Sequence, residues 1–326
     1  MQPKMNLFVV GTHCLLQIPM NGFILKTADT FSNESSWTSV LRINLTYLAR
    51  HGRLPNLASP KTFTELVQIR KLKDRNPVFP ILADKVAVKS IVSESLGSEW
   101  VTPTLWSGDE LPERPLWPAP FVIKSRHGCN QFAIMQSDNE DWSKIRKTAD
   151  AWASKTYGYW LDEWLYKDIP HGILVEPFIG RGKSLPIDYK FYVFNGEAVF
   201  IQVHLGRGGD HRWILLDRDW CRVSADTNDD DPKPPQSLNA MLAAAETLGS
   251  GMDFVRVDLY EPNGSPVFGE MTFYPGSGLD PFNPVGLDKV IGAEWLKAIH
   301  AMKRKSGLLG RAVTPIEETY SKPARV

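Results

Sequence analysis

Two short apolar runs near the end of the chain alternate with charged residues, and this pattern constrains the fold most. Residues 255–260 are Val-Arg-Val-Asp-Leu-Tyr, and residues 267–272 are Val-Phe-Gly-Glu-Met-Thr. A period of two predicts β-strands, and the intervening Glu-Pro-Asn-Gly-Ser-Pro predicts a turn, so the two runs form a hairpin. Side chains at alternate positions share a face of a strand. Arg256 and Asp258 therefore lie on one face, as do Glu270 and Thr272.

The register of this hairpin would bring two carboxylates together. With a loop from Pro262 to Pro266, Asp258 lies opposite Glu270, and cross-strand Cβ atoms are ~5 Å apart. Two acids at that distance repel unless a cation separates them or one holds a proton. Mg²⁺ prefers one or two carboxylates together with phosphate oxygens, which suits this geometry. The spacing is equally compatible with a polar outer face on which Arg256 neutralises both acids.

A second hairpin is expected in the middle of the chain. Phe121–Lys124 and Phe132–Met135 are apolar runs joined by a polar loop. A lysine at the end of such a strand can reach a phosphate, and backbone amides near Gly128 can hold another. The alternative is an edge-strand lysine before an ordinary turn.

An acidic residue interrupts another apolar strand, the one expected from Gly172 to Ile179. Burying Glu176 is costly unless it is paired or hydrogen-bonded. Two interpretations stay open, namely that it faces a polar cleft or that it caps neighbouring backbone.

An Asp-x-Asp sequence after an apolar run offers a different chemistry. Asp217 and Asp219 follow Trp213–Leu216 and resemble the metal-binding signature of many glycosyltransferases. The same sequence suits a surface turn. A third possibility is a non-catalytic binding partner of other enzymes.

The order of these patterns predicts an α+β protein with a helical N-terminal part, a small lid lobe and a larger C-terminal sheet lobe. A capping box at Thr62 predicts a helix to about Asp74, a second helix is expected over Ile81–Leu96, and a helical region extends from Trp142 towards Tyr166. Four prolines predict a linker over Leu111–Pro120. The expected divisions are a weakly structured extension at 1–40, a mainly helical region at 41–115, the lid lobe at 116–179, the C-terminal lobe with the metal site at 180–310 and a mobile tail at 311–326.

Composition excludes several partners. Acidic and basic residues number 37 each, so no net field attracts nucleic acid or anionic membrane. Three widely separated cysteines fit a reducing compartment. No segment has the length of a membrane span, and residues 1–26 lack a basic region and cleavage site. We therefore expect a cytoplasmic protein.

Together these segments resemble the ATP-grasp superfamily in the order that this family uses. More narrowly, the chain is similar to the TupA-like branch, which is associated with teichuronopeptide and other surface-polysaccharide synthesis. The match extends over about Tyr47 to Ile299. The narrower match is carried by Pro60–Phe63, Asp74–Pro77, Lys124–Gly128, Asp188–Lys190 and Gly269–Phe273. The resemblance to the wider superfamily is carried by Ala83–Lys85, Phe121–Lys124, Ile173–Ile179, Arg256–Asp258 and Glu270–Thr272.

This resemblance implies a ligase that binds ATP and Mg²⁺ between two lobes and joins a carboxylate to an amine through an acyl phosphate. The implied acceptor is a uronic acid or an acidic amino acid, and other enzymes of polysaccharide synthesis are implied partners. Two residues depart from the family pattern: the phosphate loop has Gly128 as its one glycine, and Thr272 replaces the usual metal-binding Asn. The implied site residues are Lys85, Lys124, His127, Gly128, Glu176, Pro177 and Phe178 for the nucleotide, Asp258, Glu270 and Thr272 for the metal, and Arg256 and Lys190 for catalysis.

Overall fold

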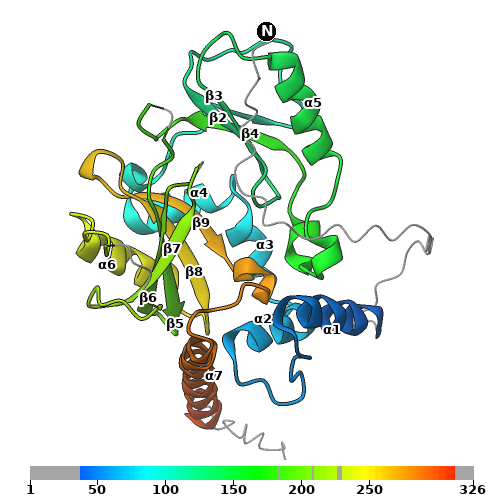
Figure 1. Cartoon of the computed structure of the whole chain (residues 1–326), viewed down its shortest axis with the longest axis vertical. Helices are drawn as coiled ribbons and strands as arrows, with labels where there is room; N and C mark the ends of the chain where they lie inside the picture. Colours follow the sequence, from blue (N-terminus) through cyan, green and yellow to red (C-terminus); the bar gives the residue numbers. More distant parts are fainter. Residues whose placement is uncertain (1–36, 183, 208, 226–229, 313–326) are drawn as a thin grey trace, which may run out of the picture.

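The computed structural model describes residues 37–182, 184–207, 209–225 and 230–312, and for residues 305–312 the backbone alone. Two antiparallel sheets and the helices around them give an α+β architecture, which confirms the expected fold class (Figure 1). The α-helices are α1 (Trp37–His51), α2 (Phe63–Lys73), α3 (Val78–Ala83), α4 (Val88–Leu96), α5 (Trp142–Ala153), α6 (Leu238–Leu248) and α7 (Gly286–Ala312). Short 3₁₀ helices are η1 (Ser98–Trp100), η2 (Tyr159–Leu161), η3 (Trp164–Asp168), η4 (Pro262–Gly264) and η5 (Pro275–Gly278).

The lid lobe is a four-stranded sheet with one helix against it. The strand order is β1-β4-β2-β3, and every neighbouring pair is antiparallel. Its strands are β1 (Trp106–Gly108), β2 (Phe121–Ser125), β3 (Phe132–Met135) and β4 (Ile173–Pro177). Apolar side chains from the sheet, from α5 and from the preceding loop form a separate small core, comprising Leu111, Phe121, Ile123, Met135, Ala149, Ile173 and Val175.

The larger lobe is built on a five-stranded antiparallel sheet in the order β7-β6-β5-β8-β9. Its strands are β5 (Asp188–Phe194), β6 (Glu197–Leu205), β7 (Arg212–Asp217), β8 (Val255–Tyr260) and β9 (Val267–Thr272). Asn195 and Gly196 both have positive φ and form the tight turn between β5 and β6, as their sequence predicts. The lid lobe lies across one end of this lobe in Figure 1. Residues of both lobes line a cavity between them.

The N-terminal helices belong physically to the larger lobe. Helix α2 begins with the predicted capping box, in which the Thr62 hydroxyl accepts the Glu65 amide hydrogen and the Glu65 carboxylate accepts that of Thr62. Phe63, its first residue, packs edge-on against Phe254 near β8. Arg70 is buried with its guanidinium 4.4 Å from the ring centroid of Trp295 in α7. Helix α2 is therefore tied to both the sheet and the last helix.

Three expected elements differ from the structure. The helix expected over residues 81–96 is two helices, since the Asp84 carboxylate accepts the Val86 amide hydrogen and pairs with Arg126 of the lid. The helical region after Trp142 ends at Ala153, and Gly158 and Asp162 then take left-handed conformations. The proline-rich segment at 111–120 packs into the lid: Leu111 is 2% exposed.

The predicted extension at 1–40 overlaps α1, because residues 37–40 are helical. Residues 1–36 and the predicted tail from 313 onward lie outside the described residues. Helix α7 includes residues 311 and 312. Across the described ranges, no helix has both the length and the apolar character needed to cross a bilayer.

Candidate active site

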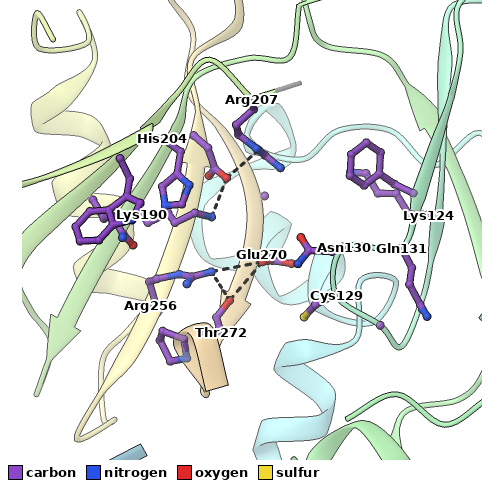
Figure 2. Close-up of a pocket in the computed structure, with 18 of the residues that line it drawn as sticks. Lys124, Cys129, Asn130, Gln131, Lys190, His204, Arg207, Arg256, Glu270 and Thr272 are labelled. Atoms are coloured by element: carbon purple, nitrogen blue, oxygen red, sulfur yellow. Dashed lines mark hydrogen bonds and ion pairs between the residues drawn. The ribbon is translucent and has the colours of Figure 1, made fainter. Parts of the chain in front are cut away.

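A cavity of about 1020 Å³ lies between the two sheets (Figure 2). Its walls come from both lobes, with the β2–β3 hairpin on one side and the face of β5, β6, β8 and β9 on the other. The predicted site residues on its walls are Lys85, Lys124, Gly128, Glu176, Pro177, Phe178, Lys190, Arg256, Glu270 and Thr272.

The sheet wall carries the two carboxylates expected from the sequence. Asp258 on β8 pairs in register with Glu270 on β9, which confirms the predicted opposition of these residues. Arg256 lies two residues before Asp258 and binds it with two hydrogen bonds, Nε to Oδ1 and Nη2 to Oδ2, both 2.7 Å long. The same Nη2 donates to the Thr272 hydroxyl at 3.0 Å. The arginine thus joins both strands (Figure 2).

A second cation completes this buried network from the neighbouring strand β5. Lys190 pairs with Asp258 across the sheet and also contacts Asp188 Oδ2 at 2.7 Å. Arg207, on the loop after β6, donates to the same Asp188 oxygen at 2.8 Å. Asp188 Oδ1 is buried without a hydrogen-bond partner. The sheet wall therefore carries cations and anions side by side on adjacent strands, and ion pairs and hydrogen bonds between strands hold them in place.

These contacts decide the ionisation of Asp258. Burial opposes its charged form, but the neighbouring Arg256 and Lys190 outweigh that effect and lower its pKa. Asp258 and Glu270 can therefore lie opposite each other without a metal, because Arg256 neutralises Asp258, as one of the two interpretations from the sequence allowed, and Lys190 adds a second cation. Two protein cations already neutralise Asp258, which is fully buried behind them and does not reach the cavity wall.

Glu270 is the more accessible carboxylate, with 31% of its side chain exposed. Its Oε1 is 3.4 Å from the Thr272 hydroxyl and 3.6 Å from Arg256 Nη2. No cluster of three or more His, Cys, Asp or Glu side chains suited to a metal occurs among the described residues. These oxygen donors nevertheless fit Mg²⁺, because that ion takes few protein ligands and completes its shell with substrate phosphates and water.

The lid wall presents two lysines on one glutamate. Glu176 on β4 is bound by Lys124 from β2, with Nζ to Oε2 at 2.5 Å, and its other oxygen contacts Lys89 of α4. Burial opposes ionisation of Glu176, but the two ammonium groups outweigh it and lower its pKa. Of the two interpretations left open for this buried acid, the structure supports the polar cleft.

The hairpin tip is held by contacts of its own. Lys85 Nζ donates to the Gly128 carbonyl at 2.5 Å, so this lysine holds the loop. A Cβ on Gly128 would lie 2.0 Å from Gln131 Oε1, so a larger residue there would require the Gln131 side chain to move. That Gln131 oxygen is buried and has no hydrogen-bond partner.

Two predicted nucleotide contacts are not available as expected. His127 is fully buried away from the cavity: it stacks on His171 with ring centroids 4.1 Å apart, and its Nε2 is 3.0 Å from the Lys155 carbonyl oxygen. Phe178 and Pro177 line the cavity, but the Phe178 amide already donates to the Pro120 carbonyl at 3.3 Å. His127 therefore supports the lid and does not touch the cavity.

The Asp-x-Asp sequence forms a turn. Asp217 Oδ1 accepts the amide hydrogens of Asp219 at 3.0 Å and Cys221 at 2.8 Å. Trp220 has φ of 65° within this turn. Neither aspartate lines the cavity. The structure therefore gives these residues a local structural role and no part in a glycosyltransferase site.

Sequence reasoning missed several charged residues at the cavity. Asp188 could have been found, because it shares a strand face with Lys190 two positions later. Lys89 follows Lys85 by four residues, but nothing in the sequence shows that it would reach Glu176. Arg207 comes from a glycine-rich loop, and its pairing with Asp188 depends on the β5–β6 register.

The two-lobed α+β fold, with ATP-grasp motifs on both walls of one cavity, defines an ATP-dependent ligase of the ATP-grasp class. The chain belongs to the TupA-like ATPgrasp family, whose model matches residues 65–296. No curated protein matches the sequence.

The chain is also similar to several solved ATP-grasp ligases. D-alanine–D-alanine ligase from Bacillus anthracis, complexed with ATP, is 13% identical with a TM-score of 0.42, and the match covers 69% of this chain and 68% of that one. VanG D-Ala:D-Ser ligase from Enterococcus faecalis is 14% identical with a TM-score of 0.39, covering 68% and 62%. The ATP-grasp ligase PsnB, complexed with a phosphomimetic variant of its minimal precursor, Mg and ADP, is 9% identical with a TM-score of 0.40, covering 73% and 65%.

Proposed function

We propose that this protein uses ATP and Mg²⁺ to join a carboxylate to an amine through an acyl phosphate. We place the reaction in the cytoplasm, in the synthesis of a surface polysaccharide or glycopeptide. The observation that carries the proposal is the meeting around one cavity of Lys124 from the lid, Lys85 from the connection between α3 and α4, and Lys190, Arg256 and Glu270 from the larger sheet. Family membership supports the use of ATP.

The cationic side chains would balance the phosphate charge and orient the triphosphate. Four of them, from two lobes, can hold the terminal phosphate so that an incoming oxygen meets it in line. Bound Mg²⁺ would supply further charge neutralisation at the phosphates, held by Glu270 with Asp258 and Thr272 nearby. Because Arg256 and Lys190 are already fixed by buried carboxylates, the sheet wall needs little rearrangement to receive the phosphates.

Lys124 has a different task from Arg256. In this structure its ammonium is bound by Glu176, and 31% of its side chain is exposed. A phosphate can replace Glu176 as its partner while Lys89 keeps that glutamate neutralised. We infer that the Lys124 ammonium moves from Glu176 to a phosphate when ATP binds. Lys89 remains paired with Glu176, so this buried carboxylate is not left without a cation, which would be destabilising.

The bond changes are those of two displacements. A carboxylate oxygen bonds to the γ-phosphorus while the bond from that phosphorus to the β–γ bridging oxygen breaks, which releases ADP. The amine nitrogen then bonds to the acyl carbon, inorganic phosphate leaves with the electron pair, and the nitrogen loses a proton to water. The protein supplies position and charge, and no protein nucleophile is needed.

The first test supplies ATP, Mg²⁺ and a panel of uronic acids and acidic peptides, with hydroxylamine as a small amine. Hydroxamate should form together with ADP and phosphate, and a chelator should abolish both. Release of AMP and pyrophosphate would show adenylation and contradict the acyl phosphate. ATP binding without consumption on any carboxylate would favour a nucleotide-binding partner without turnover.

A further inference from the structure

Helix α1 has one apolar face in the core and a second that points outward. Ile43 and Tyr47 are buried, and they anchor the helix to the larger lobe. The opposite side carries large apolar side chains at spacings of four, four and three residues, which places them along one stripe. This stripe consists of Trp37, Leu41, Leu45 and Leu48, with exposed fractions of 76%, 49%, 57% and 42%.

The apolar surface continues beyond the helix onto η2. Tyr159 and Trp160 are 61% and 65% exposed. They lie beside α1, because the Arg42 guanidinium is 5.6 Å from the Tyr159 ring centroid and binds Asp162 in the same turn. Figure 1 shows this turn next to α1 at the edge of the molecule. We call these two aromatic residues and the four stripe residues the α1 patch.

Such a cluster needs an explanation. The other exposed large apolar side chains of the described ranges come one or two to a segment, at Leu54, Val78, Ile81, Leu105, Leu116, Ile187, Val285 and Val290. Scattered residues of this kind are ordinary, whereas a contiguous exposed patch marks a surface that another segment covers. A helix with apolar residues on both faces is normally packed on both.

We propose that residues 7–25 of the same chain cover the α1 patch. This part of the sequence contains three apolar runs, Leu7–Val10, Leu15–Ile18 and Phe23–Leu25. These runs are stabilised by burial, as the patch is, because removing apolar surface from water contributes about 25 cal/mol per Å². Contact between residues 7–25 and the α1 patch would therefore remove both apolar surfaces from water.

The connection between them has a suitable length and composition. Residues 26–36 separate the last apolar run from Trp37 and have one large apolar residue, Phe31. Eleven residues can span roughly 36–40 Å when extended, whereas the 15 residues of α1 measure about 22 Å. Residues 7–25 can thus reach every part of the stripe.

Tethering favours this occupant over a second copy of the protein. A segment joined by a short linker is present at an effective concentration in the millimolar range. A second copy must bind from dilute solution and lose translational and rotational freedom. Arg42, which lies beside the patch, is already paired with Asp162, so its charge does not disfavour binding of the apolar runs.

The test compares the full-length protein with Leu41→Glu/Leu45→Glu, using hydrogen exchange of the amides in residues 7–25 and mass measurement by light scattering. Glutamate keeps the helix, because it is a good helix former. The matched control is Val290→Glu, which places the same charge at a 52% exposed apolar residue on helix α7. None of these positions lines the cavity.

We expect slow exchange in residues 7–25 of the unmodified protein, at least tenfold faster exchange in Leu41→Glu/Leu45→Glu, and no change in Val290→Glu, with a monomer throughout. Exchange that is equally fast in all three proteins would overturn the proposal. So would a dimer that the double variant dissociates while exchange in residues 7–25 stays constant, because the patch would then belong to a second copy.

Discussion

The two walls of the cavity hold their charges in different ways. On the sheet wall, Arg256, Asp258 and Lys190 are each less than 10% exposed and lie at neighbouring positions of two paired strands, β8 and β5. On the lid wall, Lys124 is the terminal cation of a short strand, and its one carboxylate partner is shared with Lys89. One wall is organised around the bidentate Arg256–Asp258 pair, and the other around lysine side chains with many rotamers.

The difference indicates a division of work within one site. Guanidinium–carboxylate pairs have a fixed geometry, so the sheet wall is organised before a ligand arrives. An ammonium on a flexible stem can exchange one anion for another at little cost. We therefore expect substitutions in the sheet wall to affect stability and turnover together, and substitutions in the lid wall to affect nucleotide affinity alone.

The largest effect should follow Asp258→Asn. This change leaves Arg256 without its bidentate partner and removes one of two carboxylates from Lys190. Removing one partner of a buried ion pair typically costs about 3–5 kcal/mol. We expect a loss of that size in urea unfolding and no measurable ATP turnover. An unchanged unfolding midpoint would show that the sheet wall is not organised by this aspartate.

The pH dependence of Asp258 provides an independent check. Its folded-state pKa lies below the unfolded value of about 3.9. Its contribution to stability is therefore complete above pH ~4 and is lost as pH falls through the folded-state pKa. Between pH 5 and pH 2, the stability of Asp258→Asn should fall less steeply than that of the unmodified protein.

Glu270→Gln separates metal binding from folding on the same wall. Its side chain is partly exposed, and its nearest charged contact is 3.6 Å away, so its loss should change the free energy of unfolding by less than about 1 kcal/mol. Turnover should nevertheless disappear, as it should in the unmodified protein with a chelator. Full activity of this variant would show that the carboxylate pair is structural.

On the lid wall, Lys124→Ala should weaken ATP binding by about 1.5–3 kcal/mol, the usual value of a hydrogen bond to a charged group. Strand β2 keeps its buried apolar residues, so the melting temperature should change little. Calorimetry of ATP binding measures the effect, with Lys147→Ala on the exposed side of α5 as the matched control. Unchanged affinity in a folded Lys124→Ala protein would remove this lysine from the site.

The smallest effect concerns His127, which supports the lid from within. Burial lowers its pKa below the unfolded value of about 6.5. The unfolded chain therefore binds more protons as pH falls below that value, and lid stability decreases on acidification. The melting temperature should drop between pH 7.5 and pH 5.5, and the drop should be smaller in His127→Gln. ATP affinity at pH 7.5 should be the same in both proteins.

Local patterns predicted local structure well. The β8–β9 hairpin and its pairing of Asp258 with Glu270 follow from alternation and a turn, and both lie within 18 residues of chain. The capping box at Thr62 is likewise a short-range signal. These features depend on neighbouring residues, which the sequence displays directly.

Long-range pairings account for what the sequence did not reveal. Asp84 breaks the helix expected over 81–96 because Arg126, 42 positions away, binds it. His127 was placed beside the nucleotide, but His171 and the carbonyl of Lys155 hold it inside the lid. Arg256 was foreseen as a partner of Asp258, but Lys190 was not, because it reaches this aspartate from another strand. Each error concerns a partner that only folding brings near.

The position of the lid within the chain has a consequence during synthesis on the ribosome. Helix α2 buries Phe63 and Arg70 against β8 and α7, yet these elements follow it by roughly 180 residues or more. At the usual 5–20 residues per second, the helix waits on the order of 10–40 s for its partners. The lid sheet, in contrast, is complete as soon as β4 emerges. The newly made chain therefore carries a finished lid while the apolar side of α2 is still uncovered, and this interval is when a chaperone would have most to bind.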